Sequence, residues 1–411
     1  MRILHVDKFL RRSGGAAGYM LDLAQRQAAQ GHQVEFFAMA DERNLPATYQ
    51  RFFPPHVSLE PPPPGARQRL STAGRMIWSR SAAKGMAAVV AAFEPDVVHL
   101  HNIYHQLSPS ILSPVAAAGI PAVLTAHDYK LVCPTYRLLS HGSLCDACVG
   151  GRVWEATRRS CQGGSRTASA VLSIESGLHR WFKAYGPVQR FIAPSRFLAD
   201  QLRRGGVFPG RIRQLNNYVD AASLTPRHGA GDGFVSIGRL SAEKGVDTLI
   251  EAVALLPHLT LTVAGEGPAR LELEALAQRL APGRVRFVGH VGAEQVAALN
   301  QSARAAVLAA RWHENMPLSV LETMAAAVPM VLTSLGGLPE LVTDGVEGLI
   351  VPPDDPPALA RALDRLQQDP SAAIAMGGAA REKMVGRFGV QAHLERLFEL
   401  YEEAAQERRD G

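Results

Sequence analysis

The sequence contains no hydrophobic run that approaches the roughly 18 residues that a transmembrane helix needs. Its first residues, MRILHVD, follow a strand pattern and lack the long apolar core and the cleavage site of a secretory signal. Hydrophobic residues make up 47% of the 411-residue chain and charged residues 20%, as in folded globular proteins. We therefore expect a cytoplasmic protein that does not span a bilayer.

Cysteine is scarce, and its few occurrences fall in one short segment. The four residues are Cys133, Cys145, Cys148 and Cys161, so they do not form the distributed framework of a disulfide-rich secreted protein. Because the two thiolates of a C-x-x-C pair can bind one tetrahedral ion, we predict a structural zinc site formed by all four. An iron–sulfur cluster, with His141 able to replace one ligand, and four ordinary reduced thiols are the alternatives.

Acidic residues are underrepresented in the first half of the chain. Residues 1–215 hold 26 Lys and Arg against 13 Asp and Glu, whereas residues 216–411 hold 17 against 25. A basic half can face an anionic membrane surface or a phosphorylated substrate, and a solvated basic surface is the plainer alternative. Nucleic acid is not expected, because the arginine pairs are scattered and no stacking aromatics lie between them. The candidate membrane-facing cations are Arg67, Arg69, Arg75, Arg80 and Lys84.

Short strand-like runs alternate with longer helical patterns, and the series occurs twice. The first set covers 2–6, 33–39, 96–101, 121–127 and 191–195, and the second covers 233–238, 259–265, 284–289, 305–310 and 329–334. This alternation predicts an α/β fold of two Rossmann-like parallel-sheet domains with an interdomain cleft.

The polar, glycine-containing stretch 205–232 places the boundary between the two domains near Leu215. We predict an N-terminal domain over 1–214 with a Cys-rich insertion at 133–161, and a C-terminal domain over 215–389. A final helix over 390–411 is a candidate to pack back on the N-terminal domain.

The segment 311–334 carries two glutamates, Glu314 and Glu322, separated by seven residues. Since proline is favoured in the first turn of a helix, we expect a helix to start near Pro317, carry Glu322 on its second turn and end before Pro329. The free N–H groups of that helix start suit a diphosphate, and each carboxylate can accept hydroxyl groups of a sugar. Two glutamates at this spacing also occur by chance in many helices.

Further candidates follow strands. Arg239 and Lys244 lie between a strand and a helix, so both cations can face a phosphate at the carboxyl end of the strand, although exposed loop charges are the alternative. Gly15, in SGGAAGYM, allows a ligand to approach the backbone closely. This string is not the G-x-G-x-x-G of dinucleotide-binding enzymes, which argues against a dehydrogenase. His127 ends a strand at the edge that faces an α/β cleft, where a structural histidine is the alternative.

Taken together, these segments resemble the large retaining glycosyltransferase family 4, which has the GT-B fold. The resemblance extends over nearly the whole chain, in the family's order, and includes TAHDYKLVCP (125–134), IGRLSAEKG (237–245), ENMPLSVLETMA (314–325) and GGLPELVTDGVEGLIVPPDD (336–355).

The resemblance implies a role for each matching residue. It assigns Arg239 and Lys244 to the donor diphosphate, Glu314 and His127 to the transferred sugar, and Glu322 to the ribose hydroxyls. The catalytic set is then His127, Glu314, Arg239 and Lys244. The donor-binding set is Gly15, Arg239, Lys244, Gly265, Val288, Glu314, Asn315, Met316, Pro317, Leu318 and Glu322. The candidates for the acceptor side are His101 and Asn102.

The implied activity is retaining transfer of a hexosyl group from a nucleotide sugar to a saccharide, with a lipid-linked acceptor favoured and UDP preferred over GDP. No Asp-x-Asp pair occurs in the chain, so the usual device for holding a divalent ion on such a donor is absent and no catalytic metal is expected. The alternatives are a nucleotide-sugar epimerase on the same fold and a non-catalytic nucleotide-sugar-binding protein. The sequence does not indicate an oligomeric state.

Overall fold

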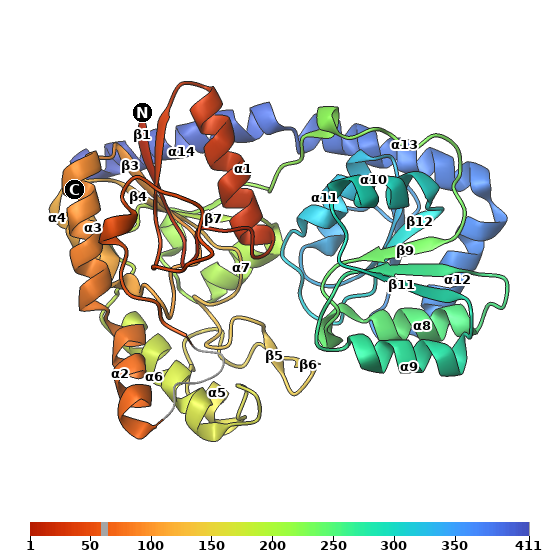
Figure 1. Ribbon diagram of the computed structural model, residues 1–411, viewed down its shortest axis with the longest axis horizontal. Coiled ribbons are helices and arrows are strands. Elements are labelled where there is room, and N and C mark those ends of the chain that lie inside the picture. Colours follow the sequence, from red (N-terminus) through yellow and green to blue (C-terminus); the bar gives the residue numbers. More distant parts are fainter. Residues whose placement is uncertain (59–64, 411) are drawn as a thin grey trace. The chain divides into compact units, whose positions relative to one another are not determined.

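The computed structural model describes residues 1–58 and 65–410. The chain divides into two compact units, each with its own hydrophobic core. Unit 1 comprises Met1–His141, Cys145–Leu215 and Leu394–Gly411, and unit 2 comprises Gly142–Leu144 and Asn216–His393. Figure 1 shows the course of the chain through these elements.

Unit 1 is built on a parallel six-stranded sheet in the order β2-β1-β3-β4-β7-β8. The strands are β1 (Arg2–Val6), β2 (Gln33–Phe37), β3 (Val97–Leu100), β4 (Ala122–Thr125), β7 (Arg190–Ala193) and β8 (Ile212–Gln214). The strands β3, β4 and β7 are buried throughout, as expected for a parallel sheet covered by helices on both faces. The helices are α1 (Gly15–Ala29), α2 (Ala66–Ile77), α3 (Arg80–Phe93), α4 (Leu112–Ala117), α5 (Glu155–Arg158), α6 (Arg166–Trp181) and α7 (Arg196–Arg204).

Side chains of β1 alternate between the two faces of this sheet. Leu4 and Val6 pack in the large core that also contains Met86 of α3. His5 points to the opposite face, where Gln27 of α1 bonds its ring. The two faces therefore differ, one being apolar and the other carrying buried polar groups.

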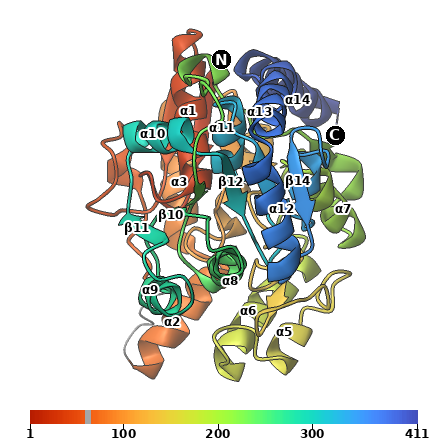
Figure 2. The ribbon, with the colours of Figure 1, turned by 90° about the vertical axis from the view of Figure 1, so that its right-hand side faces the viewer.

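Unit 2 has a parallel sheet in the order β11-β10-β9-β12-β13-β14. Its strands are β9 (Phe234–Ile237), β10 (Leu261–Ala264), β11 (Val285–Gly289), β12 (Ala305–Leu308), β13 (Met330–Thr333) and β14 (Gly348–Val351). Its helices are α8 (Val246–Ala254), α9 (Arg270–Leu280), α10 (Ala293–Ser302), α11 (Leu318–Ala325), α12 (Pro356–Gln368) and α13 (Pro370–Arg387), seen from a second side in Figure 2. The two sheets confirm the predicted α/β fold of two Rossmann-like halves.

The structure adds elements that the strand patterns did not predict. Each sheet has a sixth strand, β8 and β14, and the Cys-rich segment carries a small two-stranded sheet of β5 (Leu139–Ser140) and β6 (Ser143–Leu144). The three-residue β8 contains Arg213 and ends on Gln214, and β14 begins at a glycine, so neither resembles the longer apolar runs.

The last helix, α14 (Val390–Asp410), belongs to unit 1 from Leu394 onward. Arg190 of β7 forms an ion pair with Glu403 at 3.0 Å and a second with Glu407. Tyr401 of the same helix is fully buried. The helix thus completes the core of unit 1 although it lies at the end of the chain. Within the described residues, every helix is too short or too polar to cross a bilayer.

Candidate active site

The predicted donor residues gather at one edge of the unit 2 sheet. β9 lies between β10 and β12, and the order of strands reverses at this point. Ligands of open α/β sheets bind outside the carboxyl ends of the strands at such a switch point. Arg239 follows β9, Gly265 follows β10, and Glu314 follows β12. The topology therefore places these loops at a position suited to a ligand.

Glu314 and Lys244 meet directly. The Lys244 ammonium donates to Glu314 Oε1 at 2.5 Å, and the carboxylate is almost fully buried. Trp312 donates its indole N–H to the same oxygen at 2.7 Å, and its ring centroid lies 5.5 Å from the Lys244 nitrogen. Trp312 was not predicted from the sequence, although an aromatic hydrogen-bond donor two residues before the first glutamate was a usable signal.

Two glycines fix the backbone of Glu314. Gly337 donates its N–H to the Glu314 carbonyl at 2.7 Å. Gly336 has a φ of 62°, and a Cβ atom there would lie 2.2 Å from the same carbonyl oxygen. The GG pair of the GGLPE segment is therefore required for this close approach of two backbones.

The helix after Glu314 begins as the proline predicted. Pro317 is the extended residue that precedes α11, and Glu322 lies exposed on the second turn. Asn217 donates its side-chain amide to the Met316 carbonyl at 2.8 Å, which holds the turn before the helix. The free N–H groups of α11 thus have a fixed position next to the Glu314 loop.

The remaining donor candidates of unit 2 lie at the same edge without joining the Lys244–Glu314 pair. Arg239 is exposed, and Val288 is partly buried within β11. Gly265 has a φ of 142°, and a Cβ atom there would lie 1.8 Å from the Gly238 carbonyl oxygen. The loops after β9 and β10 therefore pack backbone to backbone, which only glycine permits.

The candidates of unit 1 lie at the corresponding edge of its sheet. β1 lies between β2 and β3, so the switch point falls there. Gly15 is the first residue of α1, which follows β1. His101 and Asn102 follow β3, and His127 follows β4. The structure thus brings the predicted residues of unit 1 to neighbouring strand ends.

A chain of hydrogen bonds runs through the buried histidines to His127. His5 Nε2 lies 2.7 Å from Gln27 Oε1, and His5 Nδ1 lies 3.1 Å from His101 Nε2. His101 Nδ1 lies 3.0 Å from His127 Nε2. At the far end, the Gln27 amide donates to the Tyr401 hydroxyl at 3.2 Å. Helix α14 is therefore linked to His127 by four consecutive hydrogen bonds.

This chain determines the tautomer of each neutral ring. Because the Gln27 oxygen only accepts, His5 carries its proton on Nε2 and accepts from His101 at Nδ1. By the same logic His101 accepts from His127, which leaves Nδ1 as the acceptor nitrogen of the His127 ring. Burial lowers the pKa of His5 and of His127 to about 4, so both rings are neutral at pH 7.

The sequence did not single out His5, His99, Gln27 or Tyr401. His99 bonds the Tyr401 hydroxyl at 2.7 Å and Thr125 Oγ1 at 2.8 Å. The alternation His99-Leu100-His101 was the available signal, because residues two apart on a strand share a face.

His5, His99 and His101 form the one candidate metal group found among residues 1–58 and 65–410. The ligand atoms of His5, His99 and His101 lie within 4.8 Å of one another. Each ring nitrogen of these residues already has a hydrogen-bond partner in the protein. A satisfied hydrogen-bond network accounts for the cluster without an ion.

Two acidic residues lie at the same edge of the sheet, Asp7 after β1 and Asp128 after β4. Burial raises the pKa of Asp7 to about 7 and raises the pKa of Asp128 above its ordinary value. The Tyr104 hydroxyl donates to Asp128 at 2.7 Å and lies 3.1 Å from the Asn102 side chain. The acceptor candidate Asn102 is thus held by a polar network that sequence reasoning did not predict.

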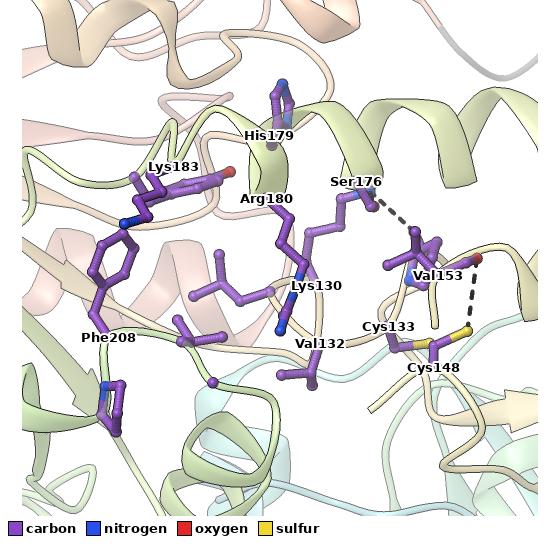
Figure 3. Close-up of a pocket in the computed structure, with 16 residues that line it drawn as sticks. Lys130, Val132, Cys133, Cys148, Val153, Ser176, His179, Arg180, Lys183 and Phe208 are labelled. Carbon is purple, nitrogen blue, oxygen red and sulfur yellow. Dashed lines mark hydrogen bonds between the residues drawn. The ribbon is translucent and has the colours of Figure 1, made fainter. Parts of the chain in front are cut away.

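The four cysteines of the predicted zinc site are free thiols in the Cys-rich segment. Cys133 and Cys148 line a cavity of about 390 Å³, shown in Figure 3. Burial, reinforced by the other three thiols, raises the pKa of Cys148 to about 12. The thiols of Cys145 and Cys161 are less buried, and Cys161 contacts Ser140 Oγ at 3.6 Å. No three of these thiols lie within 4.8 Å of one another in the described part of the chain, so the zinc site stays a prediction.

Comparison with known proteins identifies the family. The model of Glycosyltransferase Family 4 matches residues 13–223, and that of Glycosyl transferases group 1 matches residues 230–383. The chain belongs to glycosyltransferase family 4. The predicted site residues at both sheet edges, from Gly15 to His127 and from Arg239 to Glu322, fall within the matched ranges.

Several relatives of this family 4 chain have assigned names. It is 31% identical to an alpha-D-kanosaminyltransferase of Streptomyces kanamyceticus over 50% of this chain, and 32% identical to a glycogen synthase of Mycobacterium tuberculosis over 66%. The chain spans 58% and 66% of the lengths of these two relatives. A D-inositol 3-phosphate glycosyltransferase of Frankia alni is 29% identical over 90% of each chain.

Solved structures share the GT-B fold. Sucrose-phosphate synthase from Thermosynechococcus elongatus aligns over 98% of both chains with a TM-score of 0.72 and 21% identity. Anabaena HepE in complex with UDP-glucose aligns over 97% of this chain and 98% of that one, with a TM-score of 0.68 and 17% identity.

Proposed function

We propose that the protein is a retaining glycosyltransferase that moves a hexosyl group from a nucleotide sugar to a saccharide without a catalytic metal ion. The observation that carries the proposal is the buried Lys244–Glu314 pair at the switch point of unit 2, in a chain that belongs to family 4. A cation beside a buried carboxylate at this edge can serve both halves of the donor, the diphosphate and the sugar.

Each residue has a role that follows from its position and from the family resemblance. Arg239, Lys244 and the N-terminus of α11 would neutralise the diphosphate as it departs, which is electrostatic stabilisation of the leaving group. Glu314 would accept hydroxyls of the transferred sugar, and Glu322 would accept those of the ribose. His127, held neutral in one tautomer, would accept a further sugar hydroxyl at Nδ1.

The reaction needs no separate base. The bond from the anomeric carbon to the phosphate oxygen breaks, and the bond to the acceptor oxygen forms on the same face of the sugar. The acceptor hydroxyl gives its proton to the departing phosphate oxygen. The positive charge of Arg239 and Lys244 stabilises that oxygen while the sugar–oxygen bond breaks.

The donor and acceptor are proposed at a finer level. UDP is the preferred nucleotide and GDP the second, and a structure of the same fold with UDP-glucose bound supports this order. We propose a saccharide acceptor on an anionic lipid carrier, with Asn102 on the acceptor side. The other acceptor candidate, His101, is fully buried and bonds His5 and His127 through its two ring nitrogens, so it acts through His127 rather than on the acceptor. The protein would then work at the inner face of the membrane as a peripheral enzyme.

Two substitutions test the donor site. Glu322→Ala and Lys244→Ala should each lower the rate of transfer by about a hundredfold or more, because each removes an interaction with the donor. Glu382→Ala, which removes an exposed carboxylate of α13, is the matched control and should keep normal turnover. Stabilisation against heat by a panel of nucleotides identifies the base beforehand, since a ligand of the native state raises the melting temperature.

The outcome of incubation with the donor alone separates the proposal from its rivals. A transferase leaves most of the donor unchanged without an acceptor, whereas an epimerase converts its sugar. Near wild-type turnover in Glu322→Ala or Lys244→Ala would show that the donor site lies elsewhere.

A further inference from the structure

Exposed aromatic side chains gather at one end of unit 1. The helices α2, α5 and α6 lie together there, at the lower part of this unit in Figures 1 and 2. Trp181 is 83% exposed and Phe182 is 73% exposed. Three of the four tryptophans of the chain are exposed in this region. Apart from these three and Phe182, no tryptophan or phenylalanine among residues 1–58 and 65–410 is exposed. The set of exposed apolar residues is Leu70, Trp78, Trp154, Ile174, Trp181 and Phe182.

Hydrogen bonds hold the ends of α2 and α6 together. The ring of His179, in the last turn of α6, bonds the carbonyl oxygen of Ile77 at 2.8 Å. Trp78 follows Ile77 directly, and Trp181 follows His179 by two residues. The chain segments that carry the exposed residues Trp78 and Trp181 therefore lie close together.

The other apolar members lie along α6 and α5. Trp154 and Ile174 line one shallow groove between these helices, together with Arg158 and Arg166. Ile174 and Trp181 are seven residues apart on α6, so they share a face of the helix. One continuous strip thus runs from the groove to the end of α6.

The same elements are rich in cations and poor in exposed carboxylates. Residues 66–84 contain five Lys and Arg and no Asp or Glu, and residues 152–183 contain six Lys and Arg and two Glu. Both glutamates are buried in ion pairs, Glu155 with Arg158 and Glu175 with Lys130. Eight of the exposed cations on or next to these helices are Arg67, Arg69, Arg75, Arg80, Arg158, Arg166, Arg180 and Lys183.

We propose that this aromatic–basic surface, formed by the six apolar residues and the eight cations named above, docks on an anionic lipid bilayer. Tryptophan is favoured at the level of lipid headgroups, and arginine or lysine beside it is attracted to anionic lipids. An exposed strip of this kind is unusual on a protein that stays in water. This proposal rests on the proposed function only for the reason why the protein would bind a membrane. The binding itself can be measured without any sugar substrate.

The charge of the surface favours lipid over a second copy of the chain. A two-fold interface would bring the same eight cations against one another, and no exposed carboxylate of residues 66–84 or 152–183 is available to neutralise them. A bilayer that contains acidic lipids supplies the opposite charge and accepts the aromatic rings.

Flotation with vesicles tests the proposal on the full chain. The protein should float with vesicles of phosphatidylcholine and phosphatidylglycerol, should float poorly with phosphatidylcholine alone, and should be released by high salt. The double variant Trp181→Ala with Phe182→Ala should lower the bound fraction by about tenfold, because it removes the two most exposed rings. The matched control is Leu271→Ala in α9 of unit 2, whose side chain is 80% exposed, and it should float like wild type.

Three further readouts keep the result interpretable. Circular dichroism establishes that the variants are folded, and brominated lipids should quench wild-type tryptophan fluorescence more than that of Trp181→Phe. Equal flotation of the double variant and wild type would overturn the proposal. Sedimentation that shows a lipid-free dimer, lost in the double variant, would overturn it in favour of a second copy of the chain. Wild-type protein that floats as expected but transfers no sugar would count against the proposed function alone.

Discussion

At the scale of single residues, the histidine chain explains how a histidine at a strand end becomes a defined hydrogen-bond acceptor. A ring at the carboxyl edge could present either nitrogen to a ligand, and the sequence alone does not say which. The buried residues His5 and His101 remove that freedom, because the Gln27 oxygen accepts from His5 and thereby fixes which nitrogen of each following ring donates and which accepts. We therefore regard His5 and His101 as positioning residues for His127.

Substitution of His101 should change the tautomer of His127. His101→Leu removes the acceptor of the His127 Nε2 proton and should lower the turnover of transfer by about tenfold while changing the donor KM little. His101→Gln keeps one donor and one acceptor and should restore most of the activity. Nitrogen NMR of labelled histidines measures the tautomer directly and needs no substrate.

The expected spectrum of wild type has the His127 proton on Nε2, and that of His101→Leu has a mixture of both tautomers. A wild-type His127 with its proton on Nδ1 would contradict the directional chain. Equal turnover of the leucine and glutamine variants would contradict the positioning role. If wild type bound a metal ion that the histidine variants did not bind, the cluster would be a metal site rather than a hydrogen-bond network.

At the scale of elements, the sequence predicted the parts governed by local rules. Pro317 predicted the start of α11, and apolar runs bounded by turns predicted five strands of each sheet. The sequence did not predict the short strand β8, because an edge strand that contains Arg213 lacks the apolar pattern of a buried strand.

The network around His127 was not predictable for a different reason. Its members Gln27 and Tyr401 are 374 residues apart, and nothing in either neighbourhood marks a partner. Likewise, the pairing of Lys244 with Glu314 depends on the order of β9 and β12 in the sheet, which local patterns do not encode. The residues could be nominated from motifs, whereas their contacts required the topology.

The Cys-rich segment supplies a prediction at the same scale. Protein produced with zinc available should carry close to one zinc ion per chain, because four thiolates from one segment can close a tetrahedral site. Replacing both Cys145 and Cys148 with serine should remove the ion and lower the melting temperature. Elemental analysis decides the matter: wild type without metal would exclude the site, and iron with a brown absorbance would favour a cluster.

At the scale of the whole molecule, buried histidines make stability depend on pH in a defined direction. Burial lowers the pKa of His5, His127 and His393 to about 4, whereas the ordinary histidine value of 6.5 applies to the unfolded chain. Between these values the unfolded state binds more protons than the folded state, so stability is complete above pH 6.5 and is lost as the pH falls toward 4. Asp7 acts in the opposite sense, because burial raises its pKa to about 7 and its protonated form suits the folded state.

Between pH 7 and pH 5 the three histidines change the free energy of unfolding more than Asp7 does. Lowering the pH from 7 to 5 should cost about 2 kcal/mol for each of the three rings, and Asp7 should offset about 2 kcal/mol of that sum. These four groups together give a net loss of about 3–4 kcal/mol, visible as a lower denaturant midpoint at pH 5. The buried His101, whose pKa also lies well below its ordinary value, adds to this loss. His393→Gln removes one titrating ring, whose Nδ1 bonds the Asn216 carbonyl at 2.8 Å, and should weaken the pH dependence by about 2 kcal/mol while the amide retains a donor for that carbonyl. Equal midpoints at the two pH values in wild type would mean that these histidines are accessible to protons in the folded protein.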